Sequence, residues 1–181
     1  MSEIRVSVAV TGIAWMGSGT GSIESALERL FREAEQEIGL TAYTVSSGAD
    51  LLFDWLEAAL ARGVQVRLVV NRLDSQPADV ATRLKRLATT YSHFHLYDFR
   101  CESEADLHAK AIIADRRLAL VGSSNLSRRG LLANHELAVL IEGPAAADVA
   151  RAMDRLFASR YVMSIGSGRF PEPATGDQSA P

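Results

Sequence analysis

The order of the apolar segments constrains the fold of this chain more than any other feature. Residues 38–45 and 64–70 are short apolar runs with the length and composition of buried strands. Between them, residues 48–62 repeat their apolar side chains at helical spacing, and Gly63 follows as a typical helix C-cap. Strands that alternate with helices predict an α/β protein.

The remaining segments extend this pattern toward both ends of the chain. Ser22 is a plausible N-cap for a helix that reaches about residue 37, and residues 115–117 predict a turn between two adjacent strands. Loops are expected at 71–77 and 122–134. The other predicted elements are strands at 4–10, 92–97, 107–114, 118–121 and 136–141, and helices at 78–89 and 145–161. Alternating elements followed by clustered strands predict an α/β/α sandwich with a central mixed sheet.

Size and composition fit one globular domain followed by a polar tail. The chain has 181 residues, of which 48% are hydrophobic and 23% charged, so a full core is expected. We assign residues 1–164 to this domain. Residues 165–181 are rich in Gly, Ser and Pro, and we expect them to be disordered.

Charge and cysteine content exclude several classes of protein. The net charge of −3 gives no global basic field of the kind that accompanies non-specific nucleic-acid binding. A single cysteine, Cys101, excludes an intramolecular disulfide and a multi-cysteine zinc site. The apolar runs are far shorter than the roughly 20 residues of a membrane span, and the N-terminus is unlike a signal peptide. We therefore expect a cytoplasmic protein without a membrane anchor.

One constellation of polar residues carries chemistry. His108 and Lys110 are two residues apart on a predicted strand, which places them on the same side and about 6–7 Å apart. The next predicted strand ends in Gly-Ser-Ser-Asn, so that Ser123 and Asn125 offer a hydroxyl and an amide to the same space. A nucleophile or base, a cation and neutral donors suffice to bind a tetrahedral phosphate, and no metal or other cofactor is required.

These residues resemble a known signature. The pattern H-x-K-x-x-x-x-D from His108 to Asp115, followed by G-S-x-N from Gly122 to Asn125, resembles the motif of the phospholipase D superfamily. The resemblance extends over residues 6–161. In size and layout the chain is most similar to the small bacterial Nuc-like endonucleases, which carry one such motif per chain. It implies a phospholipase D-like fold and attack on phosphodiester bonds.

The resemblance also implies a role for each residue of the motif. His108 would be the nucleophile that forms a phosphohistidine, Lys110 and Asn125 would hold the nonbridging oxygens, and Ser123 would assist them. Glu136 stands where family members place a carboxylate that hydrogen-bonds the nucleophilic imidazole.

Asp115 belongs to the same signature but points to the other side of its predicted strand from His108. We expect a structural role for Asp115, at a turn or beneath a dimer contact, and no proton transfer.

One motif supplies one histidine, whereas covalent catalysis at phosphorus needs a nucleophile and an acid for the leaving group. The other histidines lack a paired lysine and Ser or Asn donors. A two-fold dimer would bring two copies of His108 to one phosphate. We therefore predict an obligate homodimer.

Residues within and after the motif are candidates for substrate binding. Ser124 lies within the motif, and Arg128 and Arg129 follow it. The arginine pair either binds flanking phosphates of a polymeric substrate or belongs to a solvent-exposed loop without a binding role. His93 and His95 are spaced like half of a metal site, but no third ligand is evident, so we predict no metal site.

The first hypothesis for function is a metal-independent phosphodiesterase, a nuclease acting on DNA or RNA through a phosphohistidine. One alternative is a phospholipid hydrolase or transferase with the same mechanism. Another is a non-catalytic, phosphate-binding accessory subunit of a bacterial defence complex similar to the DISARM system, with further protein partners.

Overall fold

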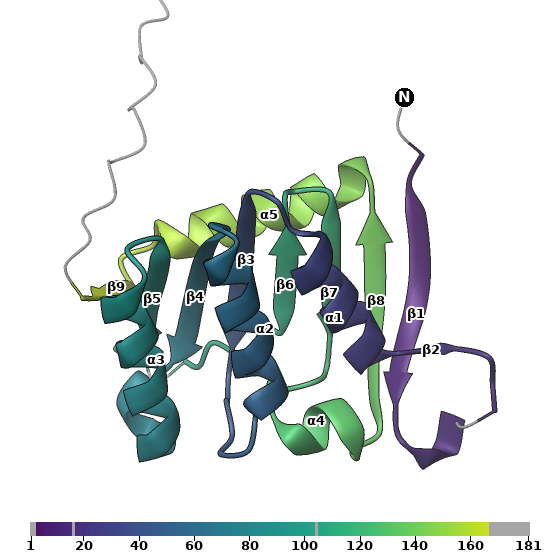
Figure 1. Ribbon diagram of the computed structural model, residues 1–181, viewed down its shortest axis with the longest axis horizontal. Coiled ribbons are helices and arrows are strands. Elements are labelled where there is room, and N and C mark those ends of the chain that lie inside the picture. The colour runs from purple at the N-terminus through teal and green to yellow at the C-terminus, as the bar shows by residue number, and fades with distance from the viewer. Residues whose placement is uncertain (1–2, 16, 104, 167–181) are drawn as a thin grey trace, which may run out of the picture.

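A single mixed sheet forms the centre of the molecule in the computed structural model, which describes residues 3–15, 17–103 and 105–166 (Figure 1). Its strands lie in the order β2-β1-β8-β7-β6-β3-β4-β5-β9. In chain order they are β1 (Arg5–Thr11), β2 (Gly21–Ser22), β3 (Glu37–Ala42), β4 (Gln65–Asn71), β5 (Phe94–Phe99), β6 (Ala111–Ala114), β7 (Leu118–Gly122), β8 (Glu136–Glu142) and β9 (Val162–Ile165).

Helices cover both faces of this sheet. Three helices lie on the near face in Figure 1: α1 (Ile23–Glu33), α2 (Asp50–Ala61) and α3 (Ala78–Thr90). Helix α5 (Pro144–Phe157) crosses the far face, and the short α4 (Arg128–Leu132) lies below the sheet. Two 3₁₀ turns, η1 (Ile13–Trp15) and η2 (Leu73–Ser75), complete the elements. The predicted α/β/α sandwich on a mixed sheet is confirmed.

Strand directions bring the ends of many strands to one edge of the sheet. Strands β3, β4 and β5 are parallel, whereas β6 is antiparallel to β3, and β7, β8 and β1 continue the antiparallel pairing. The C-terminal ends of β1, β3, β4 and β7 therefore meet the N-terminal ends of β6 and β8 at one edge, the lower edge in Figure 1. We call it the motif edge, because His108, Lys110 and Ser123 all lie at these strand ends.

Two apolar layers hold the helices to the sheet. The larger layer lies under α1, α2 and α3, where leucines such as Leu27, Leu56 and Leu84 are almost fully buried. Burial of one such side chain contributes roughly 1.5–3 kcal/mol. Small residues dominate under α5 and let it approach closely: at Gly39 of β3, a Cβ atom would lie 3.1 Å from Ile113 and 3.4 Å from Met153 of α5.

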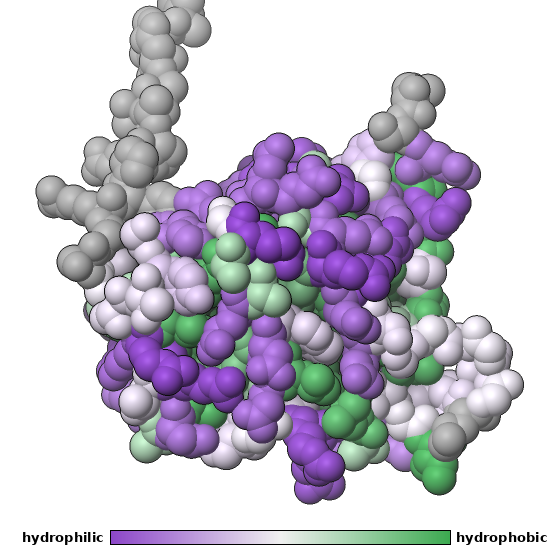
Figure 2. Space-filling view, in the orientation of Figure 1, coloured by the Kyte–Doolittle hydropathy of each residue, from purple (hydrophilic) through white to green (hydrophobic). Residues whose placement is uncertain are grey.

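Hydrophobic side chains are also exposed along the β1 side of the sheet, which lies at the right of Figure 2. Val6 is 61% exposed, Val8 47%, Val121 38% and Leu137 47%. Val139 of β8 pairs with Val8 of β1 on one side and with Val121 of β7 on the other. We call Val6, Val8, Val121, Leu137 and Val139 the open apolar face.

Four differences from the sequence prediction bear on the site and on the end of the domain. The first helix ends at Glu33 instead of about 37, because β3 begins at Glu37. Strand β6 begins at Ala111 instead of 107. A helix, α4, lies inside the predicted loop 122–134, where five residues are too few to show periodicity.

The fourth difference is β9, an edge strand that follows the shortened last helix and pairs with β5; its last residue, Ile165, falls in the predicted tail. Residues 167–181 of that tail lie outside the described residues.

Candidate active site

His108 and Lys110 lie just before β6, at the motif edge. They are not on a strand, as the sequence predicted, but in an extended segment that leads into it. Their side chains nevertheless meet: Nζ of Lys110 lies 2.9 Å from Nδ1 and 3.2 Å from Nε2 of His108. The Lys110 ammonium also donates to the backbone carbonyl of His108 at 2.8 Å. A titratable ring and a cation therefore share one exposed position.

Side chains from neighbouring strands fix this extended segment. The buried Thr41 of β3 accepts from the N–H of Ala111 at 2.9 Å and donates to the carbonyl of Ala109 at 2.9 Å, so it brackets Lys110. The buried Asn71 of β4 accepts from the N–H of Leu107 at 2.8 Å. The Lys110 carbonyl accepts from the N–H of Gly122 at 3.1 Å, and the Thr41 and Asn71 side chains satisfy further backbone groups of this segment.

Tyr43, directly after β3, packs against the same pair of side chains. The ring centroids of Tyr43 and His108 are 4.5 Å apart, and Nζ of Lys110 lies 5.2 Å from the Tyr43 ring centroid. On the other side of the segment, Asn71 donates to the carboxylate of Asp106 at 3.1 Å. The histidine is thus flanked by an aromatic ring, a cation and a carboxylate.

The second half of the motif follows β7. Gly122 is needed here, because a Cβ atom would lie 2.5 Å from Cβ of Ala138 in the neighbouring strand β8. Beyond it, the Ser123 hydroxyl donates to the carboxylate of Glu136, which also accepts from Asn134 at 3.2 Å. No hydrogen bond within the described parts of the chain joins Glu136 to His108, so the contact implied by the resemblance is not formed in this single chain.

Asn125 carries an unsatisfied acceptor. Its Oδ1 atom is buried and has no hydrogen-bond partner among the described residues. Helix α4 holds its backbone, since Gly130 packs so closely that a Cβ atom there would lie 2.5 Å from the Asn125 carbonyl. Ser124 lines a small cavity together with Lys110 and Thr41, which places the two halves of the motif side by side.

The charges at the site are unevenly buried. Burial lowers the pKa of Lys110, while the negative charge of Glu136 opposes this. The Asn71 hydrogen bond lowers the pKa of Asp106, and the charges of Arg72 and His108 act in the same direction. The site therefore combines a partly desolvated cation with a stabilised carboxylate on its rim.

Asp115, the last residue of the signature, lies at the opposite edge of the sheet. Its carboxylate accepts from the backbone N–H groups of Glu35, Gln36 and Glu37, each at 2.9 Å. Burial alone would raise the pKa of Asp115, but these three donors and Arg117 lower it. Asp115 thus joins the β6–β7 turn to the start of β3 and has no contact with the site.

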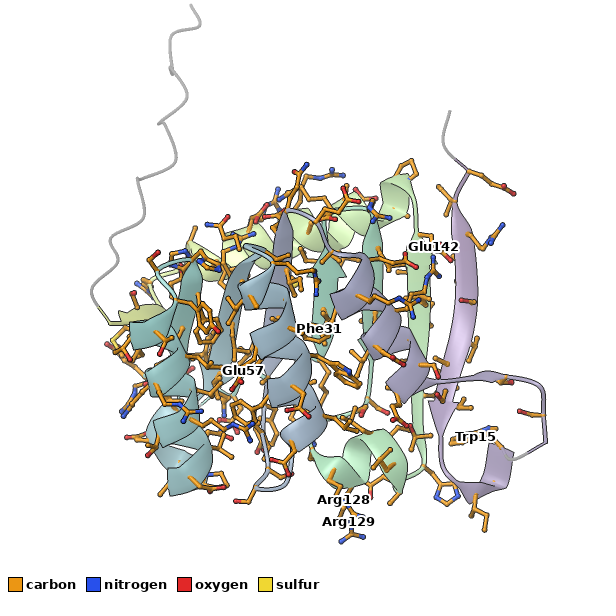
Figure 3. The ribbon with its side chains drawn as sticks, in the orientation of Figure 1. Trp15, Phe31, Glu57, Arg128, Arg129 and Glu142 are labelled. Carbon is orange, nitrogen blue, oxygen red and sulfur yellow. The ribbon has the colours of Figure 1, made fainter. Side chains whose placement is uncertain are left out.

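Arg128 and Arg129 begin α4 at the motif edge and point away from the protein (Figure 3). Neither forms an ion pair with any described residue. The structure thus gathers His108, Lys110, Ser123, Ser124, Asn125 and Glu136 at one edge, with the arginine pair exposed beside them.

Sequence reasoning missed Thr41, Tyr43, Asn71 and Asp106. Thr41 and Tyr43 lie inside the predicted strand 38–45, and Asn71 directly follows the predicted strand 64–70. The position of Asn71 was the available signal, because strand ends at a shared edge are where polar side chains converge.

Two further features of the described residues bear on the type of site. Within residues 3–166, positions 16 and 104 aside, no group of three His, Cys, Asp or Glu side chains is arranged to hold a metal ion. None of the helices in this part of the chain has the length and apolar character needed to cross a bilayer.

Comparisons with known proteins agree with this fold and motif. Residues 27–161 match the family model of the cardiolipin synthase, phospholipase D-like domain. The chain therefore belongs to the phospholipase D superfamily. Its fold resembles the crystal structure of Nuc, a phospholipase D family member from Salmonella typhimurium, with a TM-score of 0.72 and 21% identity over 91% of this chain and 100% of Nuc.

Two curated relatives point to different biological settings. The DISARM protein DrmC of Bacillus paralicheniformis is 29% identical over 143 residues, which cover 78% of this chain and 58% of DrmC. Cardiolipin synthase A of Serratia proteamaculans is 34% identical over 120 residues, which cover 66% of this chain and 24% of the synthase. The chain thus spans little more than half of one relative and about a quarter of the other.

Proposed function

We propose that this chain is a metal-independent phosphodiesterase that forms a phosphohistidine at His108, with nucleic acid as its substrate. The observation that carries the proposal is the contact of His108 with Lys110, which lines one small cavity together with Ser124. A nucleophilic ring, a cation and neutral donors at one exposed edge are the groups needed to bind and attack a phosphodiester.

The residues divide the reaction between them. A His108 nitrogen attacks phosphorus, a P–N bond forms, and the P–O bond to the leaving group breaks. Lys110 and Asn125 bind the nonbridging oxygens, on which negative charge grows in the transition state. A bound phosphate would draw the Lys110 ammonium from the imidazole, since an anionic oxygen is the stronger acceptor. Water then attacks the phosphohistidine, the P–N bond breaks, and a phosphate monoester leaves.

Both steps need a second proton-transfer group, and we assign it to His108 of a second copy. In the first step its imidazolium gives a proton to the leaving oxygen; in the second its neutral ring accepts a proton from water. The open apolar face supports this assembly, because it reaches the motif at Leu137, beside Glu136, and at Val121, beside Gly122. Burial of such a face favours association with a second copy.

Nucleic acid is favoured as substrate by two observations. Arg128 and Arg129 are exposed at the motif edge, where they are placed to bind flanking phosphates of a polymer. The chain also matches Nuc over that protein's whole length.

The relatives define the two alternatives: a phospholipid reaction, as the name cardiolipin synthase indicates for that relative, and a phosphate-binding subunit in a DISARM-like complex.

An assay of the purified protein in excess EDTA separates the nuclease from both alternatives. We expect turnover of bis-p-nitrophenyl phosphate and of DNA or RNA oligonucleotides, and none of phospholipid vesicles. Turnover of vesicles alone would favour the lipid enzyme, and binding of oligonucleotides without any turnover would favour the accessory subunit.

The covalent step is tested by acid-free quenching during turnover, followed by mass spectrometry of peptides. A phosphoryl group on the peptide that contains His108 is expected. A label on another residue, or a strict metal requirement, would contradict the mechanism.

The shared site is tested by subunit mixing. Wild-type chains are unfolded and refolded together with His108→Ala chains in equal amounts. If one site uses both histidines, only dimers of two wild-type chains work, and about a quarter of the activity remains; independent sites leave about half.

A further inference from the structure

Among the residues that the structure describes, the Tyr43 ring contacts both members of the His108–Lys110 pair. It is half-buried and its backbone is fixed, because the Gln76 amide donates to the Tyr43 carbonyl at 3.2 Å and accepts from the N–H of Val45 at 3.0 Å. The ring planes of Tyr43 and His108 are tilted by 55°. The imidazole therefore rests against a ring that the loop after β3 holds in place.

This contact bears on the repulsion between two basic groups of the site, Lys110 and His108. Lys110 lies 2.9 Å from the imidazole, so that an imidazolium at His108 would be repelled by the ammonium. The face of an aromatic ring carries partial negative charge and attracts cations within about 6 Å of its centre. Tyr43 is within that range of Lys110 and also packs on His108, so its ring offsets the repulsion.

The other charges around His108 are few. Asp106 lies two residues before it, near enough for the charge of His108 to lower the Asp106 pKa, but that carboxylate is already bonded to Asn71 and Arg72. Glu136 acts on Lys110 and is bonded to Ser123 and Asn134. Both carboxylates are thus engaged elsewhere, whereas the Tyr43 ring faces the pair directly.

We propose that Tyr43 is a positioning residue that holds the His108 ring and keeps its imidazolium form accessible beside Lys110. The inference deepens the proposed function and rests on it, since only a histidine that alternates between nucleophile and acid needs both protonation states. It assigns the loop after β3 a part in proton transfer that the motif residues alone do not explain.

The test compares two substitutions that differ in the ring alone. Tyr43→Phe keeps the aromatic face, and Tyr43→Leu removes it while keeping an apolar side chain. NMR of the imidazole C–H protons follows the protonation of His108 without requiring turnover. We expect the midpoint of the titration to fall by about 0.5 pH units in Tyr43→Leu and to stay unchanged in Tyr43→Phe. The His108→Ala spectrum assigns the signal.

Kinetics give a second measurement on the same variants. In Tyr43→Leu, kcat for bis-p-nitrophenyl phosphate should fall by about threefold to tenfold, and the alkaline limb of its pH profile should move to lower pH by the same 0.5 units. Tyr43→Phe should keep both kcat and the alkaline limb as they are in the wild type. Urea unfolding of each variant separates this effect from loss of fold.

The outcomes distinguish the inference from the function on which it rests. An unchanged titration midpoint in Tyr43→Leu overturns the role of Tyr43, even when the wild type turns over substrate. A Tyr43→Phe variant that behaves like Tyr43→Leu also overturns it, because the hydroxyl would then be the active group. A wild type without turnover, but with the expected midpoint shift, contradicts the proposed function and supports the electrostatic contact.

Discussion

The two ends of β6 contrast in how their polar groups are satisfied. At the end near Ala114, the Asp115 carboxylate takes three backbone N–H groups, and Arg67 and Arg116 share the carboxylates of Glu37 and Asp154. At the end near Ala111, Lys110 contacts another basic group, and the buried Oδ1 of Asn125 has no partner among the described residues.

This difference separates stability from binding within one motif. Satisfied groups lower the free energy of the folded chain, whereas unsatisfied ones cost stability and leave donors and acceptors for a ligand. Four residues of strand separate the two regions, so the same signature includes residues of both kinds. We therefore expect substitutions at the motif edge to change activity and those at the opposite edge to change stability.

The largest effect is expected for His108→Ala. Removal of the nucleophile should reduce turnover of bis-p-nitrophenyl phosphate to below about 1% of wild type. Because the side chain is exposed, the free energy of unfolding should change by less than about 0.5 kcal/mol in a urea titration. Residual turnover above about 1% of wild type would argue against His108 as nucleophile.

Lys110→Ala should remove about 2 to 4 kcal/mol of transition-state stabilisation, measured as kcat/KM. Lys85→Ala, on the exposed side of α3, is the matched control and should have no effect. A loss smaller than tenfold would contradict contact of Lys110 with the phosphate.

The pH profile gives the sign of the Lys110 effect. Burial lowers the pKa of Lys110, so its ammonium is lost at a pH below the ordinary 10.5 of lysine. Activity should fall as pH rises through this lowered pKa, and Lys110→Arg should remove that part of the alkaline limb, because a guanidinium stays charged.

Asp115→Asn tests the opposite edge. The backbone here has a φ of 49°, which asparagine tolerates, so the substitution reports on the carboxylate alone. Loss of charge-assisted hydrogen bonds should lower the free energy of unfolding by about 2 to 4 kcal/mol and leave kcat within twofold. Asp148→Asn on the exposed surface of α5 is the control.

The pH dependence of that effect follows from the lowered pKa of Asp115. A depressed carboxyl pKa contributes stability that is present above the unfolded value of 3.8 and is lost as pH falls through the folded value. The stability difference between wild type and Asp115→Asn should thus be full near neutral pH and shrink below pH 3.8. A difference that does not depend on pH would refute the charged hydrogen bonds.

The smallest effect is expected at α4. Arg129→Ala should weaken oligonucleotide binding by about threefold to tenfold and reduce the slope of log affinity against log salt by about 1. Hydrolysis of the small substrate should be unchanged. Arg155→Ala, on the exposed side of α5, should leave both unchanged; equal effects of the two would show a general effect of charge.

Much of this fold was predictable because apolar periodicity follows burial. The runs that became β3 and β4 and the helix between them were placed within a few residues, since each buries a continuous apolar surface. Helix α4 and strand β9 were missed because five and four residues are too few for a pattern, and their positions depend on tertiary contacts such as the β5–β9 pairing.

The site was predictable only where a linear motif contained it. His108, Lys110 and Ser123 were found by spacing, yet the assignment of His108 to a strand was wrong, because Thr41 and Asn71 take the place of a strand partner for its backbone. Tyr43 lies near His108 because β3 and β6 are neighbours in the sheet, whereas Asp106 precedes His108 by two residues in the chain.

Residues 107–110 are tied to the sheet at a few points. Thr41 and Asn71 hold the backbone, the Lys110 carbonyl accepts from the N–H of Gly122, and the Leu107 side chain is buried. Loss of the Thr41 or Asn71 contact therefore removes one attachment and leaves the pairing of β6 with β3 and β7 intact. A segment attached in this way is able to follow the small displacement between a trigonal-bipyramidal phosphorus and a tetrahedral one while the sheet stays in place.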